Sequence, residues 1–333
     1  MSDDLERPAG DRRVVVMGAG AFGTALAVVM ARDGADVTLW ARDADQVAEM
    51  QASRRNPRHL GGVVLPERLR VSAELPDVVD PGVPVLLAVP MQALSGVLDS
   101  HGHRFRASAL IACCKGIELA TLRGPTAVIA DHCPLALPAV LTGPSFAADI
   151  AAGLPTALTL ACHDAAGGAI LQRQLSTPSL RLYHSTDVRT AELGGALKNV
   201  IAIAAGMVIG RGLGDSARAA LMTRGLTEMS RLARALGSDA ASLEGLAGLG
   251  DLILTCTSEQ SRNFRFGLAL GRGESFPPGV TVEGAATARA AARLARERGI
   301  DMPITTMVAA VLDGTHSLAE AAQALMSRPL KEE

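Results

Sequence analysis

The chain has 333 residues, about twice the length of an ordinary domain, which predicts two domains. Its 48% hydrophobic and 20% charged residues exclude a disordered or collagen-like protein. Acidic and basic residues nearly balance at 34 and 32, and only 2% of residues are aromatic, so we expect no nucleic-acid partner.

The first half of the chain alternates short apolar runs with helical patterns. This alternation predicts an α/β domain whose mostly parallel sheet is covered by helices on both faces. The expected strands are residues 13–17, 37–40, 83–89, 109–113, 139–142, 156–161 and 180–183.

No strand pattern follows residues 185–187, whose serine, threonine and aspartate offer a helix N-cap. We place the domain boundary near residue 186, with a Rossmann-type dinucleotide-binding domain at 1–186 and an all-helical substrate-binding and catalytic domain at 187–333. Helical periodicity is found at residues 187–211, 215–236, 259–270, 281–298 and 303–312.

Two apolar stretches imitate membrane segments. Residues 14–31 follow two arginines as in a signal peptide, but their glycines and the turn at 33–36 favour a strand, a helix and a second strand. Residues 191–209 contain Glu192 and Lys198, which are costly in lipid. We therefore expect no membrane span and a buried helix at 191–209.

The five cysteines are dispersed and form no C-x-x-C pair, as is typical of reduced thiols in the cytoplasm. Histidines cluster only at His101 and His103, without further ligands at metal spacing. We expect a cytoplasmic protein without a metal site.

Gly18-Ala19-Gly20-Ala21-Phe22-Gly23 follows the first strand and opens a helix. In this setting a G-x-G-x-x-G motif predicts that the diphosphate of a dinucleotide binds at the helix N-terminus. The alternative is a packing turn without a ligand.

Arg42 lies at the end of the second strand, where NAD-specific domains usually carry an acidic residue. A 2′-phosphate would suit this arginine, which favours NADPH, whereas the following Asp43 leaves NADH possible. The alternative is a solvated arginine on a turn.

Only three of the 32 basic residues are lysines, and two of them, Lys115 and Lys198, lie in apolar stretches that contain glycine. Lysine is costly to bury without a task, although both could be retained by chance. Lys115 follows a predicted strand, and Gly143-Pro144-Ser145-Phe146-Ala147 follows the next one. Both segments are therefore expected at the carboxyl edge of the sheet, where ligands bind. The alternative is that both are ordinary tight turns.

Lys198 lies among small residues of the first helix of the second domain, near Gly194 and Gly195. Partial burial would lower the pKa of its amine into the range useful for proton transfer. The alternative is a structural ion pair with Glu192 or Asp251.

A second polar cluster comprises residues 248–252, 255–257 and Ser261-Arg262-Asn263. An arginine at a helix start suits a phosphate dianion, because its guanidinium and the helix amides all donate hydrogen bonds. Solvated helix-cap chemistry is the alternative.

Together these motifs resemble those of the bacterial-type NAD(P)-dependent glycerol-3-phosphate dehydrogenase family. The resemblance runs from residue 13 to about 310, and its stretches at Lys198 and Asp251 are highly specific. The matching stretches are residues 18–27, 115–118, 143–147, 192–206, 248–252, 255–258 and 261–263.

The resemblance implies reversible reduction of dihydroxyacetone phosphate to sn-glycerol 3-phosphate by NADPH or NADH, for phospholipid synthesis, in a cytoplasmic homodimer. It implies that Lys198 is the general acid and base. The implied substrate contacts are Lys115, Gly143, Ser145, Lys198, Asp251, Ser261, Arg262 and Asn263, and the implied cofactor contacts are Ala21, Phe22, Arg42, Lys115, Ala147, Arg262 and Glu283. The glycine motif itself adds Gly18, Gly20 and Gly23 to the expected cofactor contacts.

The sequence departs from the family at Met91, where serine is frequent, and at His184, where threonine is usual. Both departures affect expected contacts at the edge of the cofactor. Two rival functions remain. A dehydrogenase for another small hydroxy acid would have less need of Arg262, and a non-catalytic NAD(P)-sensing module would need neither Lys198 nor Asp251.

Overall fold

The computed structural model of the chain describes residues 12–76 and 79–327. Within these ranges the chain forms two compact units, described separately below. The first unit contains the chain up to Cys114, Thr126–Leu141 and Ser145–Val188, and the second contains Lys115–Pro125, Thr142–Pro144 and the chain from Arg189 onward.

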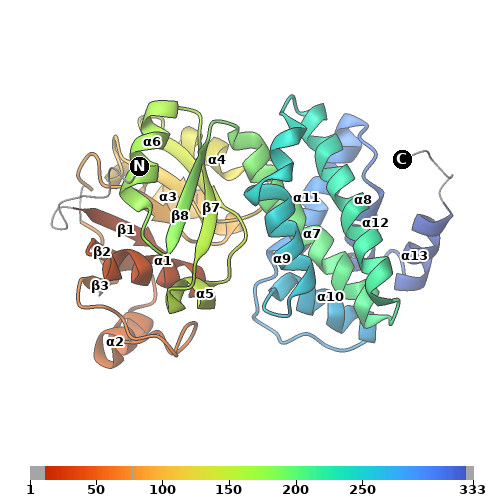
Figure 1. Cartoon of the computed structure of the whole chain (residues 1–333), viewed down its shortest axis with the longest axis horizontal. Helices are drawn as coiled ribbons and strands as arrows, with labels where there is room; N and C mark the ends of the chain where they lie inside the picture. The colour runs from red at the N-terminus through yellow and green to blue at the C-terminus, as the bar shows by residue number, and fades with distance from the viewer. Residues whose placement is uncertain (1–11, 77–78, 328–333) are drawn as a thin grey trace, which may run out of the picture. The chain divides into compact units, whose positions relative to one another are not determined.

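The first unit is built on an eight-stranded sheet with the order β3-β2-β1-β4-β5-β6-β7-β8 (Figure 1). The pairs β3–β2, β2–β1, β1–β4, β4–β5, β5–β6 and β7–β8 are parallel. The strands are β1 Arg13–Met17, β2 Asp36–Trp40, β3 Leu69–Ser72, β4 Val85–Leu87, β5 Ala109–Ala112, β6 Leu137–Thr142, β7 Thr156–Cys162 and β8 Leu180–Ser185.

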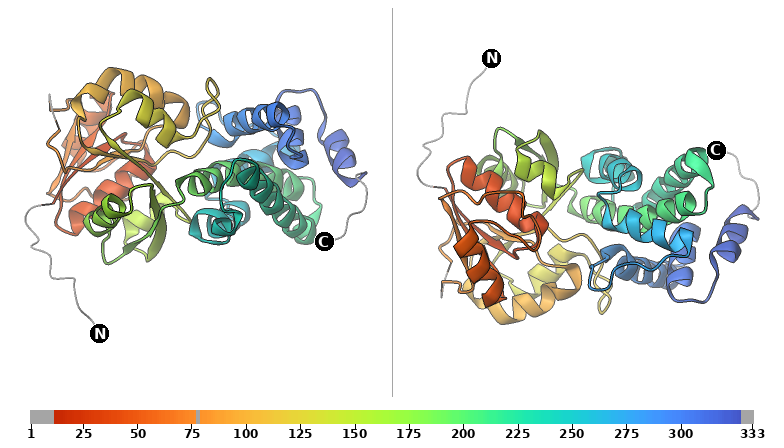
Figure 2. Two further views of the ribbon diagram at one scale, coloured as in Figure 1. Left: turned by 90° about the horizontal axis from the view of Figure 1, so that it is seen from above. Right: turned by 90° about the horizontal axis from the view of Figure 1, so that it is seen from below.

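Helices cover both faces of this sheet, with α1 and α5 on one face and α3 and α4 on the other (Figure 2). The central strands are apolar along their whole length because both faces are buried, as in β4, where all three residues are buried. The helices are α1 Ala21–Arg32, α2 Ala44–Ser53, α3 Leu94–His101, α4 Pro125–His132, α5 Ala147–Ala152 and α6 Ala165–Leu175.

The expected Rossmann-type sheet is confirmed, and all seven predicted strands are present. The prediction missed β3, which adds to β2 at the edge of the sheet. Its four residues include the exposed Arg70 and the polar Ser72, so the run is too polar to resemble the central strands.

The second unit is helical, as predicted. Figure 1 shows α7 among the other helices of this unit. Gly206 of α7 lets α10 approach closely, since a Cβ at this position would clash with the Phe264 carbonyl oxygen. The helices are α7 Val188–Gly210, α8 Gly214–Ala235, α9 Asp251–Thr257, α10 Arg262–Arg272, α11 Glu283–Arg298, α12 Pro303–Leu312 and α13 Leu318–Met326.

The long helix α7 is the one helix of the described residues that is long and apolar enough to cross a membrane. Most of its apolar stretch is buried inside the protein, as expected for residues 191–209. The signal-peptide-like residues 14–31 form most of β1, the glycine turn and most of α1.

Two helices of the second unit were missed by the sequence analysis. Helix α9 has only seven residues and follows a π-helical turn, Leu246–Gly250, so it is too short for a periodic pattern. Helix α13 has a recognisable start, a capping box between Ser317 and Glu320.

Candidate active site

The glycine turn between β1 and α1 has the geometry of a dinucleotide-binding turn. Gly18 has φ +112°, and a Cβ there would lie 2.5 Å from the Ala88 carbonyl oxygen, so only glycine fits. A Cβ on Gly23 would clash with the Gly18 carbonyl oxygen, so glycine at this position lets the helix pack against the turn.

Gly20 is the N-cap of α1 and supplies no side-chain cap, while Ala21 and Phe22 begin the helix. Apart from Gly20 and its neighbours in the chain, no atom of the described residues lies within 4 Å of the position that a Gly20 Cβ would occupy. The first amides of a helix need hydrogen-bond acceptors, and an anion can supply them. The turn therefore fits the diphosphate of NADH or NADPH.

Arg42 follows β2 and is exposed, whereas the neighbouring Asp43 is already engaged. One oxygen of Asp43 accepts the Asp45 and Gln46 amides at the start of α2, and the other pairs with Arg58 at 2.7 Å. The Gln46 amide, followed by the Arg58 guanidinium, holds the pKa of Asp43 below its usual value. Arg42 is thus the side chain still available at the end of β2.

The second unit brings two lysines to one carboxylate. Lys198 Nζ lies 2.8 Å from Oδ1 of Asp251, and Lys115 Nζ lies 2.6 Å from Oδ2. Lys198 also donates to Thr255 Oγ1 at 2.7 Å, and Lys115 donates to the Gly143 carbonyl oxygen at 3.1 Å. Of the two partners considered for Lys198 in an ion pair, the structure therefore selects Asp251.

Each of these side chains has a local reason for its position. Asp251 is the first residue of α9, and Thr255 lies one turn later on the same face. The glycines of α7 admit their neighbours, because a Cβ on Gly194 would clash with the Ala247 carbonyl oxygen and one on Gly195 would lie 2.6 Å from Thr142 Oγ1. The glycines predicted to surround Lys198 thus let the π-helical turn before α9 and the Thr142 segment pack against α7.

Burial and charge determine the protonation of this cluster. Burial, opposed by Asp251 and reinforced by Lys115, lowers the pKa of Lys198 to about 8. Burial alone would raise the pKa of Asp251, but Lys115 and Lys198 outweigh it and keep the pKa below its usual value. With both amines protonated, the three groups carry one net positive charge, which favours an anion or a developing alkoxide.

The predicted serine, arginine and asparagine at the start of α10 differ in exposure and in hydrogen-bond partners. Ser261 is the N-cap, and its Oγ accepts the Phe264 amide at 3.2 Å. Arg262 is the exposed first residue of the helix. Asn263 donates to Asn199 Oδ1 at 2.9 Å and accepts the Gly284 amide at 3.0 Å. It thereby joins α10 to α7 and α11.

The remaining predicted residues begin helices or lie just before them. Ala147 is the first residue of α5, with Ser145 two residues earlier in the first unit, and Glu283 is the first residue of α11 in the second. Of the two departures, Met91 is buried and its sulfur lies 3.8 Å from Cys114 Sγ. His184 lies on β8 and packs over Gly168.

The structure places three residues at or near the lysine cluster that were not among the predicted site residues. Thr255 could have been found from its four-residue spacing to Asp251, since that spacing puts both on one helix face. Asn199 follows Lys198 directly and bonds Asn263. Thr142 is buried, and its hydroxyl has no partner within the described part of the chain, a feature without a sequence signal.

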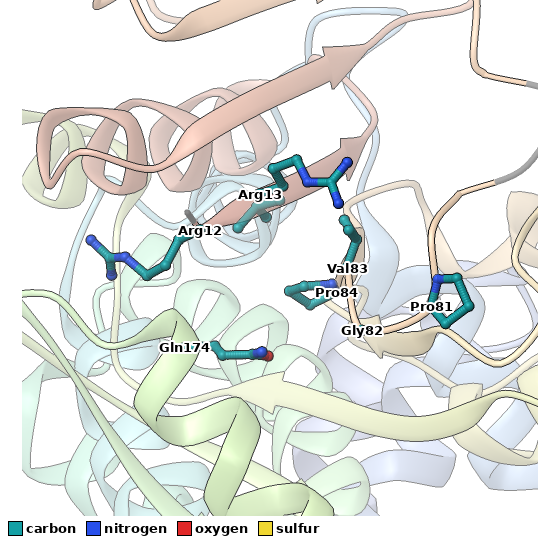
Figure 3. A pocket seen from close by; sticks show the side chains of 8 residues that line it. Arg12, Arg13, Pro81, Gly82, Val83, Pro84 and Gln174 are labelled. Carbon is teal, nitrogen blue, oxygen red and sulfur yellow. The ribbon is translucent and has the colours of Figure 1, made fainter. Parts of the chain in front are cut away.

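Figure 3 shows a pocket of about 190 Å³ elsewhere in the first unit. Arg12 and Arg13, from the start of β1, extend to opposite sides, and Pro81–Pro84 precede β4. The pocket therefore lies at the amino ends of these parallel strands, whereas the glycine turn follows the carboxyl end of β1. Ligands of such sheets bind at carboxyl ends, so this pocket does not belong to the dinucleotide site.

Comparison with known proteins identifies related enzymes. The family profile described as NAD-dependent glycerol-3-phosphate dehydrogenase N-terminus matches residues 13–167, and its C-terminus profile matches residues 187–323. The chain is 59% identical to the glycerol-3-phosphate dehydrogenase [NAD(P)+] of Paracoccus denitrificans, over 96% of this chain and 99% of that one. It is also 59% identical to the enzyme of the same name from Cereibacter sphaeroides, with the same coverage.

A solved structure supports the same relationship. The crystal structure of glycerol-3-phosphate dehydrogenase from Coxiella burnetii matches with a TM-score of 0.89 and 38% sequence identity. The match covers 96% of this chain and all of that one.

Proposed function

Because this chain belongs to the NAD-dependent glycerol-3-phosphate dehydrogenase family, it is an NAD(P)-dependent oxidoreductase of glycerol 3-phosphate, and we propose that Lys198 moves the proton in its reaction. The enzyme interconverts dihydroxyacetone phosphate and sn-glycerol 3-phosphate, the backbone of glycerophospholipids. The observation that supports the role of Lys198 is its hydrogen bond to Asp251, combined with a pKa of about 8.

In the reduction, NAD(P)H supplies a hydride to the ketone carbon when it is bound. Lys198 donates a proton to the ketone oxygen as negative charge develops there, and in the reverse reaction its neutral amine removes that proton. Asp251 orients the amine, and Thr255 holds it through a second hydrogen bond. Lys115 adds a second positive charge that stabilises the developing alkoxide.

The remaining substrate contacts follow from the positions of the polar groups. Arg262, with Ser261 and Asn263, is proposed to hold the phosphate through the guanidinium and the first amides of α10. Gly143 and Ser145 are proposed to contact the remainder of the substrate. Binding the phosphate at a distance from the reacting carbon uses binding energy to position that carbon.

We propose that residues 1–186 bind the cofactor and that residues 187–333 carry the catalytic groups. Lys115 and Gly143 lie within residues 1–186 in the sequence but belong to the second unit, so we count them with the catalytic groups. Gly18, Gly20, Ala21, Phe22 and Gly23 would surround the diphosphate. Arg42 would contact a 2′-phosphate, which favours NADPH. The further cofactor contacts proposed are Lys115, Ala147, Arg262 and Glu283.

A cytoplasmic homodimer is proposed for the assembled enzyme. All five cysteines are buried, and no disulfide joins them in the described part of the chain, which suits a reducing compartment. Light scattering after size-exclusion chromatography measures the number of subunits directly, and a monomer at working concentration would contradict this proposal.

Initial rates of NADPH and NADH oxidation with dihydroxyacetone phosphate test the function, and a stereospecific assay identifies the product. We expect sn-glycerol 3-phosphate, and Lys198→Arg should abolish most of its formation. Turnover of small hydroxy acids in preference to the phosphate ester would indicate the related dehydrogenase. Tight cofactor binding without turnover of any substrate would indicate a sensing module.

A further inference from the structure

The carbonyl oxygen of Ala19, inside the glycine turn, accepts hydrogen bonds from two side-chain amides. Gln46 Nε2 and Asn56 Nδ2 each lie 2.9 Å from this oxygen. Gln46 is on α2, and Asn56 lies three residues after its end. Both amide groups are buried, Asn56 completely.

Asn56 is connected to more than the turn. Its Nδ2 also donates to Thr24 Oγ1 at 2.8 Å, and Thr24 is a buried residue of α1. Burying an amide is costly unless its hydrogen bonds are made. Asn56 therefore binds the turn and the helix that follows it, and Gln46 provides a second bond to the same carbonyl.

These bonds determine the direction of the next backbone amide. The described residues contain no cis peptide, so the Ala19–Gly20 peptide is trans and planar. In such a peptide the carbonyl and the N–H point in opposite directions. With the Ala19 carbonyl directed at the buried amides, the Gly20 N–H points away from them, at the N-cap of α1.

Orientation and polarity of this peptide both affect anion binding. A rotated peptide would turn its carbonyl oxygen toward a bound anion and repel it. A carbonyl that accepts two hydrogen bonds also polarises its own peptide, which strengthens the N–H as a donor. The two amide side chains thus favour the orientation that an anion at the helix N-terminus needs.

We propose that Asn56 and Gln46 are positioning residues of the dinucleotide site, which hold the Ala19–Gly20 peptide so that the Gly20 N–H faces the cofactor diphosphate. This inference rests on the proposed binding of the cofactor by the glycine turn. Neither side chain touches the cofactor in this role, because both act through the Ala19 carbonyl.

Titration of the purified enzyme with NADPH tests the proposal in three variants. Gln46→Met keeps the side-chain volume but removes the donor, and Asn56→Ala removes the second donor. The matched control is Gln51→Met, because Gln51 lies on the same helix and donates Nε2 to the Val71 carbonyl oxygen at 2.9 Å, away from the turn.

We expect Gln46→Met to weaken NADPH binding about 3- to 10-fold, the effect of one hydrogen bond, and Asn56→Ala to weaken it at least as much. Gln51→Met should remain within twofold of wild type. At saturating cofactor, kcat should be unchanged in Gln46→Met. Adenosine 2′-monophosphate, which lacks the diphosphate, should bind all three variants as it binds wild type.

Four results would overturn the proposal. Unchanged NADPH affinity in Gln46→Met would show that its bond does not orient the donor. Equal losses for NADPH and adenosine 2′-monophosphate would show a general structural role, as would equal losses in Gln46→Met and Gln51→Met. A wild-type enzyme that binds neither NADPH nor NADH would overturn the proposed cofactor site as well, so the two failures are distinguishable. If Asn56→Ala does not fold, Gln46→Met decides alone.

Discussion

Lys198 and Asp251 form a hydrogen-bonded ion pair 2.8 Å long between two buried side chains that lie 53 residues apart in the chain. A buried charge needs such a partner, because removal of either group leaves the other charge uncompensated in the protein interior. Here the arrangement is an amine with a lowered pKa, held by two acceptors, Asp251 and Thr255.

Replacing Lys198 by arginine tests proton transfer separately from charge. Arginine does not deprotonate near neutral pH, so Lys198→Arg should preserve charge and cofactor binding but lower kcat by roughly 10² to 10⁴. Lys198→Met should be no more active. NADPH affinity is the control, and a folded Lys198→Arg enzyme with more than about a tenth of wild-type kcat would exclude Lys198 as the general acid, with Lys115 the next candidate.

The pH dependence of the two reaction directions should be opposite. Reduction needs protonated Lys198, so its kcat/KM should fall as the pH rises above about 8. Oxidation of glycerol 3-phosphate needs the neutral amine, so its kcat/KM should fall as the pH drops below the same value. Rate profiles from pH 6 to 10 measure both limbs. A limb that persists unchanged in Lys198→Arg would belong to another group.

Asp251→Asn should destabilise the protein, because it leaves two lysines without their buried counter-charge. We expect a loss of about 3 to 5 kcal/mol in the free energy of unfolding at pH 7. Without the carboxylate, the pKa of the buried Lys198 should fall further below that of a lysine in the unfolded chain. The unfolded chain then binds more protons than the native state, so the variant becomes more stable as the pH rises and its loss relative to wild type diminishes.

The matched control for this variant is Asp313→Asn. Its partner Arg289 lies 2.6 Å away, but both side chains are more than 40% exposed, so we expect a loss of at most about 1 kcal/mol. Urea unfolding measures both variants. Equal losses would show that burial does not distinguish the two carboxylates.

Arg42→Asp should change cofactor preference. It removes a cation from the end of β2 and introduces a negative charge, which repels a 2′-phosphate. We expect KM for NADPH to rise far more than KM for NADH. Equal changes in the two KM values would remove the reason for proposing NADPH.

Arg262→Ala should reduce kcat/KM for dihydroxyacetone phosphate by roughly 1.5 to 3 kcal/mol for each charge-assisted hydrogen bond lost. The loss should nearly vanish with unphosphorylated dihydroxyacetone, because that substrate has no phosphate to bind. Similar losses for both substrates would contradict the phosphate contact and leave Arg262 only its proposed cofactor contact or a role in the fold.

Short stretches of sequence determined much of this protein. The glycine turn was predictable because strand, turn and helix are adjacent in the chain and Gly18 needs a positive φ that other residues avoid. The longer helices were also predictable, because the periodic spacing of their apolar residues lies within a single segment of the chain. Lys198 was identified by its rarity among arginines and by the small residues around it.

Only the tertiary structure decided which partners these residues have. Asp251 meets Lys198 and also Lys115, which lies 136 residues away, and Asn56 meets the Ala19 carbonyl across 37 residues. Such pairs depend on how closely the turn before α9 approaches Gly194 of α7 and on where the chain returns after α2. Local propensity does not encode these distances, because they arise from the packing of side chains that are remote in the chain.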